Sequence, residues 1–351
     1  MTATETGGLA ARFRRLIAAT GPITLAHYMA EANARYYSSR DPLGAGGDFV
    51  TAPEISQMFG ELIGLWLADM WDRAGRPAPV HYVELGPGRG TLARDALRAM
   101  RRYGLDPSVH LVEGSAALGR VQAAAVPDAQ RHADLTTLPA DGPLLLVANE
   151  FLDALPVRQL LKTAHGWREL LVATEGERFV CTPGDRPMDA ALPEALRDAP
   201  EDTLIETGPA AAAIVEDVAA LLAVQGGAAL FVDYGHDAPR TGSTLQAVRA
   251  HRKVDVFADP GEADLTAHVD FATLAPLAQA RGARWLGTVP QGAWLRALGI
   301  EMRAEALSQA APEQREAVMA AKHRLIGEEQ MGALFKVMGL AAPEWPDGAG
   351  F

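Results

Sequence analysis

Residues 80–91, VHYVELGPGRGT, decide the fold of this chain. The apolar run before the glycines predicts a buried strand, and the segment that begins at Thr91 has the periodicity of a helix. Gly86, Gly88 and Gly90 lie between the two. A glycine-rich turn at such a junction lets the backbone approach a ligand, and the helix N-terminus offers free N–H groups. The stretch therefore predicts a ligand-binding turn at the first strand–helix junction of a sheet.

Strand-like and helix-like segments alternate after this turn. Strands are expected at 109–113, 144–148 and 228–232, and helices at 116–125 and 214–224. The second and third of these strands are almost continuously apolar, as in strands that are covered on both faces. Because strands that alternate with helices are joined by right-handed crossovers, the pattern predicts an α/β fold with a parallel sheet.

Two segments interrupt the alternation. Residues 155–205 contain short alternating strands broken by glycine and proline, which predicts antiparallel hairpins inserted between two core strands. Residues 238–325 depart again, with helices expected near 271–281 and 291–309.

Helical segments precede the glycine turn. Two helical runs occupy 9–39, a turn-rich loop covers 40–53, and a long amphipathic helix is expected at about 56–73. We therefore divide the chain into an N-terminal helical region over 1–75, which would include a cofactor lid, and a core over 76–351 that carries both insertions.

The composition excludes several classes of protein. The 351 residues include 44 acidic and 32 basic ones, for a net charge of −12, so we expect no nucleic-acid partner. No apolar run is long enough to span a membrane. The single cysteine, Cys181, excludes a disulfide scaffold and favours a reducing compartment. The nine histidines show no metal-ligand spacing, so no metal is expected.

The spacing of the glycines distinguishes two nucleotide ligands. A dinucleotide-binding turn follows Gly-x-Gly-x-x-Gly, but the third position here is Thr91. Glu84 precedes the first glycine, where a carboxylate repels a pyrophosphate and suits a cationic ligand. This combination predicts S-adenosylmethionine as the ligand. Glu113 would accept hydrogen bonds from the ribose hydroxyls, and Asp134 would bind the adenine amino group. A tight turn without a ligand is the alternative.

Acidic residues follow two of the buried strands. Asn149, Glu150 and Asp153 come after one strand, and Asp233 and His236 end the next. Open α/β sheets bind ligands at the carboxyl ends of their strands, and carboxylates that leave a hydrophobic strand are costly unless they bind something. We therefore expect a polar site at this edge of the sheet.

Five blocks together resemble the MidA family of class I methyltransferases, which includes a mitochondrial arginine methyltransferase of complex I assembly. The blocks are DFVTAPEISQMFGE (48–61), ELGPGRGT (84–91), ANEFLDALP (148–156), VDYGH (232–236) and ADLTAHVDF (263–271). The likeness spans roughly residues 20–340. One departure is Ser243, where the family usually has Asp.

The resemblance implies a class I methyltransferase (Rossmann-like) sheet with N-terminal helices and inserted antiparallel hairpins and helices. It also implies S-adenosylmethionine as the methyl donor and, for the mitochondrial member, an arginine of a partner subunit as acceptor. The block that contains Thr51 and Glu54 would be a lid over the methionine end of the donor. The expected donor-binding residues are Thr51, Glu54, Glu84, Gly86, Gly88, Gly90, Glu113, Asp134 and Asn149.

An arginine acceptor is a cation that carboxylates can hold by paired hydrogen bonds. We expect Glu150, Asp153 and Asp233 to form this clamp and His236 to accept the released proton. The alternatives are a small-molecule methyltransferase and a non-catalytic assembly factor; the glycine spacing disfavours a nicotinamide-dependent oxidoreductase.

The expected partner is a protein substrate, by resemblance a subunit of respiratory complex I, and the inserted hairpins could also pair two copies in a homodimer. The expected location is the bacterial cytoplasm, or the mitochondrial matrix in a eukaryote.

Overall fold

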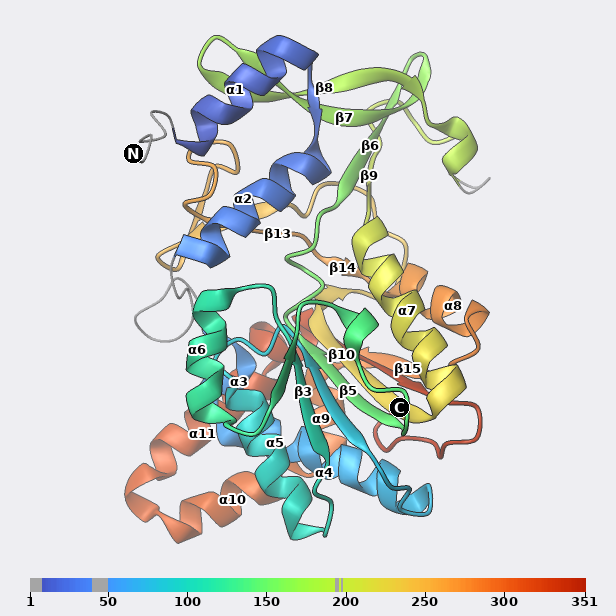
Figure 1. The fold of residues 1–351 in the computed structure, drawn as a ribbon. Coiled ribbons are helices and arrows are strands. Elements are labelled where there is room, and N and C mark those ends of the chain that lie inside the picture. Colours follow the sequence, from blue (N-terminus) through green and yellow to red (C-terminus); the bar gives the residue numbers. More distant parts are fainter. Residues whose placement is uncertain (1–7, 40–49, 193–195, 197) are drawn as a thin grey trace, which may run out of the picture. The chain divides into compact units, whose positions relative to one another are not determined.

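The computed structural model describes residues 8–39, 50–192, 196 and 198–351, which form two compact units (Figure 1). The core unit contains the described part of Asp41–Asp153 with Ala212–Ala238 and Val269–Phe351. The hairpin unit contains the described part of Met1–Arg40 with Ala154–Ala211 and Pro239–His268.

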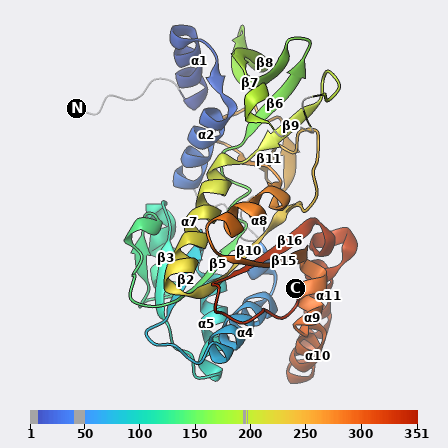
Figure 2. The ribbon, with the colours of Figure 1, turned by 90° about the vertical axis from the view of Figure 1, so that its right-hand side faces the viewer.

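An eight-stranded sheet forms the centre of the core unit, in the order β15-β16-β10-β5-β2-β3-β4, with β14 beside the end of β10. Figure 2 labels β15, β16, β10, β5, β2 and β3 of this sheet. The strands are β2 (His81–Leu85), β3 (Ser108–Val112), β4 (Gln130–His132), β5 (Leu144–Asn149), β10 (Gly227–His236), β14 (Val269–Asp270), β15 (Arg284–Pro290) and β16 (Phe335–Ala341). All neighbours from β10 to β4 are parallel, and β16 and β15 add antiparallel strands on the other side of β10. The predicted α/β class with a mostly parallel sheet is confirmed.

The helices of the core unit follow the expected alternation in its first half. They are α3 (Ala52–Ile55), α4 (Gln57–Arg73), α5 (Thr91–Arg102), α6 (Ala116–Ala125), α7 (Pro209–Gln225), α8 (Phe271–Ala280), α9 (Gln291–Ala297), α10 (Ile300–Ala310) and α11 (Arg315–Ile326). Short 3-10 turns form η1 (Leu135–Thr137) and η4 (Pro312–Gln314), and a π turn forms η5 (Glu328–Gly332). Helix α4 begins where Ser56 Oγ accepts a hydrogen bond from Met58 N.

The apolar runs of the sequence become strands with two buried faces. Leu145 and Val147 of β5 belong to the cluster that α4, α5 and α9–α11 cover, together with Leu230 and Val232 of β10. The intervening residues of both strands are buried as well. Because residues alternate between the two faces of a strand, this burial explains why the runs are continuous.

Antiparallel strands make up the hairpin unit. One sheet joins β1 (Ile23–Thr24), β6 (Arg158–Thr163), β7 (Gly166–Glu175), β8 (Arg178–Pro187) and β9 (Leu204–Thr207). A three-stranded sheet joins β11 (Gln246–Arg249), β12 (Arg252–Val254) and β13 (Asp264–Thr266); the helices are α1 (Leu9–Thr20), α2 (Leu25–Ser39) and the 3-10 turn η2 (Asp189–Ala191). The hairpins expected in 155–205 are therefore present, between β5 and β10.

The units run differently from the regions expected at 1–75 and 76–351. Between α1 and α2, Ile23 and Thr24 pair with β7, so the first helices belong with the hairpins, whereas α4 packs on α5 of the core unit. Residues 40–49 of the expected loop lie outside the described residues.

The second departure, 238–325, is not a single insertion. It supplies β11–β13 to the hairpin unit and β15 to the main sheet. The helix expected over 291–309 is two helices, because Gly299 has φ of +87° and ends the helical path between α9 and α10.

Among the residues that the structure describes, none of the helices has both the length and the apolar composition that a bilayer span requires.

Candidate functional site

The glycine turn joins β2 to α5, as expected. Gly86, Gly88 and Gly90 have φ of +61°, +51° and +79°, which L-residues with side chains rarely adopt. A Cβ at Gly86 would lie 2.7 Å from the Phe151 ring, so Gly86 leaves room for the segment after β5. A Cβ at Gly90 would lie 3.2 Å from Ala125 of α6, so packing and backbone geometry already account for that glycine.

Glu84 lies inside β2 and is 3% exposed. Its Oε2 accepts a hydrogen bond from the Tyr82 hydroxyl at 2.6 Å. Burial raises the pKa of Glu84 to about 8, although the hydrogen bonds from Tyr82 and the backbone of Ala93 act in the opposite direction. A cationic ligand nearby would favour the ionised form, and the contact of Glu84 with the donor stays a prediction.

Glu113 follows β3 and borders a hollow of about 440 Å³. The hollow is lined by Glu113, Gly114, Ser115, Gly119, Arg120, Ala123 and Arg131. The carboxylate of Glu113 accepts hydrogen bonds from Ser115 N at 2.7 Å and from Gln122 Nε2 at 3.3 Å. Burial raises the pKa of Glu113. Sequence reasoning missed Gln122, because its signal is a polar residue on the buried side of α6.

Asp134 precedes η1 and is exposed. Its Oδ1 accepts hydrogen bonds from Thr136 N at 2.9 Å and from Thr136 Oγ1 at 2.5 Å, and these bonds lower the pKa of Asp134. The structure thus gives Asp134 a capping role, and its contact with adenine stays a prediction.

The short helix α3 connects two parts of the expected site. Glu54 Oε1 accepts a hydrogen bond from the Oγ1 hydroxyl of Thr91, and Thr91 is the first residue of α5. The backbone N–H of Ala52 donates to Glu150 Oε1 at 3.0 Å. The carbonyl of Thr51 accepts the first hydrogen bonds of α3. The segment expected to be a lid is therefore fixed to the glycine turn and to the end of β5.

Glu150 follows β5 in a strained backbone conformation, with φ of +49°. Burial raises the pKa of this carboxyl to about 7; nearby Asp153 acts in the same direction, and hydrogen bonds from Ala52 N and Asn149 Nδ2 oppose it. Asn149 Oδ1 is buried and has no hydrogen-bond partner among the described residues. A buried acceptor of this kind is suited to a ligand with N–H groups.

Asp233 of β10 makes its hydrogen bonds with backbone N–H groups. Its Oδ2 accepts hydrogen bonds from the backbone N–H groups of Phe151, Leu152 and Asp153, at 3.2, 3.0 and 3.2 Å, and Oδ1 accepts one from Tyr234 N at 3.0 Å. Burial, with Asp153 and Glu150 nearby, raises the pKa of Asp233. With four backbone donors on its two oxygens, Asp233 fixes residues 151–153, and its place in the clamp stays a prediction.

His236 ends β10 at the same edge of the sheet. Its Nδ1 lies 2.8 Å from the carbonyl oxygen of Ala238 and 3.6 Å from Asp270 Oδ1. Since a carbonyl only accepts, the proton belongs on Nδ1, which leaves Nε2 as the basic nitrogen.

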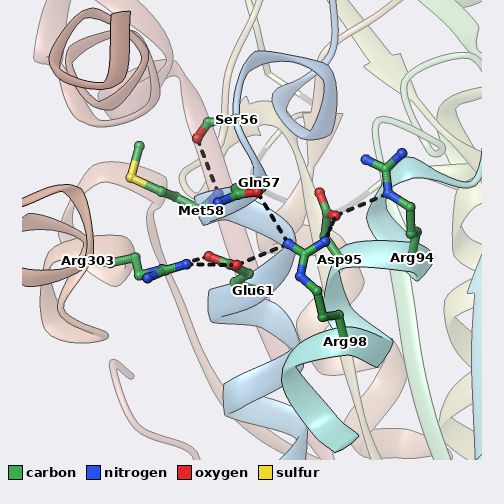
Figure 3. Close-up of polar contacts among 8 residues, drawn as sticks. All are labelled: Ser56, Gln57, Met58, Glu61, Arg94, Asp95, Arg98 and Arg303. Atoms are coloured by element: carbon green, nitrogen blue, oxygen red, sulfur yellow. Dashed lines mark hydrogen bonds and ion pairs between the residues drawn. The ribbon is translucent and has the colours of Figure 1, made fainter. Parts of the chain in front are cut away.

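Charged side chains hold together the helices that support the glycine turn (Figure 3). Glu61 of α4 accepts hydrogen bonds from Arg98 of α5 at 3.0 Å and from Arg303 of α10 at 2.7 and 2.9 Å. Asp95 accepts a second bond from Arg98, at 2.7 Å. Burial alone would raise the pKa of Glu61, but the two arginines lower it below its usual value.

The contacts of the core unit therefore connect several of the predicted residues in two groups. One group includes Glu54, Thr91, Gly86, Phe151, Asp233, Glu150 and Ala52, and a second includes Gly88, Gln122 and Glu113. Asp134 and His236 make their hydrogen bonds outside these two groups. Carboxylates at the strand ends, a left-handed glycine turn and the unpartnered oxygen of Asn149 fit a cationic ligand with N–H groups and a ribose.

Known proteins resemble this chain over most of its length. Residues 62–289 match a family model described as S-adenosyl-L-methionine-dependent methyltransferase. The chain is 38% identical over 364 residues to protein arginine methyltransferase NDUFAF7, mitochondrial, of Bos taurus, and the match covers 92% of this chain and 81% of the relative. The Drosophila melanogaster homologue is 37% identical over 377 residues, covering 95% and 85%.

Solved structures agree with the sequence relatives. A crystal structure of a Burkholderia thailandensis protein bound to S-adenosyl-homocysteine has a TM-score of 0.84 at 33% identity, covering 95% of this chain and 91% of that one. A native structure of a protein from the same organism has a TM-score of 0.81 at 32% identity, covering 97% and 95%. The predicted fold and the predicted donor are confirmed, and the chain belongs to the MidA family of S-adenosyl-L-methionine-dependent methyltransferases.

Proposed function

We propose that this methyltransferase transfers the methyl group to an arginine of a protein partner. The observation that carries the proposal is the polar group after β5. Asp153 is buried, Glu150 Oε1 accepts a hydrogen bond from Asn149 Nδ2, and Asn149 Oδ1 has no partner among the described residues. The names of the mitochondrial relatives support arginine as the acceptor. By the family resemblance, a subunit of respiratory complex I is the partner.

The donor site in this proposal uses residues from several elements of the core unit. Glu84 faces the amino group, Glu113 accepts hydrogen bonds from the ribose hydroxyls and Asp134 binds the adenine amino group. Gly86 and Gly88 allow close approach of the turn, while Thr91 and Glu54 fix α3, with Thr51 at its start, over the methionine end. S-adenosylmethionine, when bound, supplies a methyl group that its sulfonium already activates for in-line displacement.

The acceptor site has to hold a guanidinium, which is a cation at any physiological pH. Glu150 and Asp153 accept its N–H groups, and the positive charge favours the ionised form of Glu150 despite the raised pKa of that carboxyl. Asp233 holds the backbone N–H group of Asp153, and the backbone N–H group of Glu150 donates to the carbonyl oxygen of Val232. His236 Nε2 accepts the proton that the reacting nitrogen loses. Exclusion of water and alignment of the nitrogen with the methyl group supply most of the acceleration.

Glu150→Gln tests this assignment. The variant keeps the size of the side chain and its contact with Ala52 but loses the charge. We expect transfer of labelled methyl groups to arginine-containing proteins of a cell lysate to fall by about 100-fold, with donor affinity within a factor of about 3 of the parent.

Glu313→Gln is the control, because Glu313 is an exposed acidic residue of η4. Unchanged labelling of arginine by the Glu150 variant would contradict the proposal that Glu150 binds the acceptor guanidinium. Label found on a small molecule would favour the alternative acceptor class, and donor binding without any transfer would favour an assembly factor.

The partner and the location follow from the same proposal. The exposed lone thiol of Cys181 suits a reducing compartment such as the bacterial cytoplasm or the mitochondrial matrix. A homodimer formed through the hairpins stays a prediction.

A further inference from the structure

Gln122 links two separate parts of the donor site. It lies on α6 and is fully buried. Its Nε2 donates to the carbonyl oxygen of Gly88 at 2.9 Å and to Glu113 Oε2 at 3.3 Å. Gly88 belongs to the glycine turn after β2, and Glu113 follows β3. One side chain from a third element therefore fixes the turn and the carboxylate relative to each other.

The other end of the same amide indicates what the side chain contributes. Gln122 Oε1 is buried, and no described residue donates a hydrogen bond to it. A buried acceptor without a donor costs free energy, so an apolar side chain of similar length would pack better at this position. The two N–H bonds, and not burial, account for an amide here.

Glu113 is a carboxylate whose direction matters. Ser115 N holds Oε1 at 2.7 Å, and Gln122 holds Oε2. The backbone of Gly114 also donates to this carboxylate, so three of its four lone pairs are used and one is left for a further donor. A ribose hydroxyl matches such a fixed acceptor.

We propose that Gln122 is a positioning residue of the donor site, which aims the Glu113 carboxylate at the ribose hydroxyls and keeps it in register with the glycine turn. The proposal rests on the ribose contact that the proposed function assigns to Glu113. It predicts that Gln122 affects recognition of the ribose more than the stability of the fold.

The test compares two ligands on two proteins by calorimetry. S-adenosylhomocysteine and its 2′-deoxy analogue are titrated into the parent chain and into Gln122→Leu. The parent should bind the deoxy analogue about tenfold more weakly, as expected for a hydrogen bond to a charged group. In Gln122→Leu this ratio should fall to about 1–2, mainly because S-adenosylhomocysteine binds more weakly. Its melting temperature should change little, since removal of the unpartnered oxygen offsets part of the loss of the two hydrogen bonds.

Gln159→Leu is the matched control. Gln159 is also a buried glutamine whose Nε2 donates to a carboxylate, that of Glu206, at 2.8 Å, but it belongs to the hairpin unit. This control should keep the full discrimination of the parent.

Two results would overturn the proposal in different ways. If Gln122→Leu keeps the discrimination of the parent, Gln122 is not a positioning residue and the Glu113 contact stands. If the parent binds both ligands equally, the ribose contact fails and the role of Gln122 fails with it. Transfer to arginine is measured separately through Glu150, so neither result is confused with failure of that function.

Discussion

Tyr82 and Glu84 act as a pair on one face of β2. Tyr82 is fully buried, and its hydroxyl donates to Glu84 at 2.6 Å. The bond orients one carboxylate oxygen and favours ionisation of a side chain that burial would keep neutral. A pKa of about 8 means that Glu84 changes its protonation state close to neutral pH. The affinity of the protein for a cationic donor should therefore depend on pH.

Donor affinity should rise with pH up to about 8, the pKa of Glu84. Below that pH part of the binding free energy is used to ionise the carboxyl, and above it the ammonium group of the donor begins to lose its own proton, so affinity should be greatest near pH 8. Tyr82→Phe removes a bond that lowers this pKa, so the midpoint should move upward and binding at about pH 7 should weaken several-fold. Calorimetry of S-adenosylmethionine between about pH 6 and about pH 9 measures both effects.

Tyr28→Phe is the control for this pair, because Tyr28 is also fully buried and its hydroxyl donates to Val256 O in the hairpin unit. It should leave the profile unchanged. A flat profile in the parent would show that Glu84 does not contact the donor.

At the level of elements, α4 and α5 approach each other closely at Gly64. A Cβ there would lie 2.3 Å from the carbonyl oxygen of Ala96. The ion pair of Glu61 with Arg98 joins the same two helices, and its ion pair with Arg303 joins α4 to α10. Because α5 begins at the glycine turn, this contact also supports the position of the turn.

Gly64→Ala should therefore destabilise the core unit. The methyl group forces the two backbones apart, at a cost of about 1–3 kcal/mol in the free energy of unfolding. Urea denaturation measures the change. Gly114→Ala, at a position with nothing within 4 Å of the added Cβ, should change stability by less than about 0.5 kcal/mol. Equal stability of the two variants would contradict the close packing.

Three histidines form a row across β2, β3 and β4. Nδ1 of His81 lies 3.2 Å from Nε2 of His110, and Nδ1 of His110 lies 3.0 Å from Nε2 of His132. At one end of the row His81 Nε2 lies 2.9 Å from Asp141 Oδ1, and at the other end His132 Nδ1 lies 2.8 Å from Thr137 Oγ1. Each ring nitrogen thus has a partner when the imidazoles are neutral, and burial, with the neighbouring rings, lowers the pKa of His110 to about 4.

This row predicts a pH-dependent stability. The unfolded chain binds a proton on His110 below its ordinary pKa of about 6.5, whereas the folded chain binds it only near pH 4. The neutral form of His110 therefore adds about 2 kcal/mol to the free energy of unfolding. This contribution is present above about pH 6.5 and is lost as the pH falls toward 4.

His110→Phe should remove this component, so the difference in unfolding free energy between parent and variant should shrink as the pH falls. His165→Phe, at an exposed position, should follow the parent. A constant difference between parent and His110→Phe from about pH 7 to about pH 4 would contradict the prediction.

At the scale of the whole molecule, local sequence patterns predicted much of the fold. The glycine turn after residue 85 and the apolar runs at 144–148 and 228–232 predicted the parallel sheet, because a strand covered on both faces leaves a continuous apolar signature. The pairing of β16 with β10 was not predictable, since it depends on contacts between residues about a hundred positions apart.

The candidate site was predictable in its composition and less so in its roles. The sequence identifies Asp233 as an acidic residue at a strand end, but only the structure shows four backbone donors around it. Gln122 carries no motif, and its importance arises from two acceptors on other elements. Roles of this kind depend on the partners a side chain meets after folding.

The interleaving of the two units limits how the protein can be taken apart. Each unit is assembled from three separate stretches of chain. No single cut releases either one whole, and a fragment that stops before residue 335 would leave β10 with an open row of backbone groups along one side. Mapping experiments on this enzyme should therefore use point substitutions in the full chain, because truncations would report on exposed strand edges and aggregation instead of on catalysis.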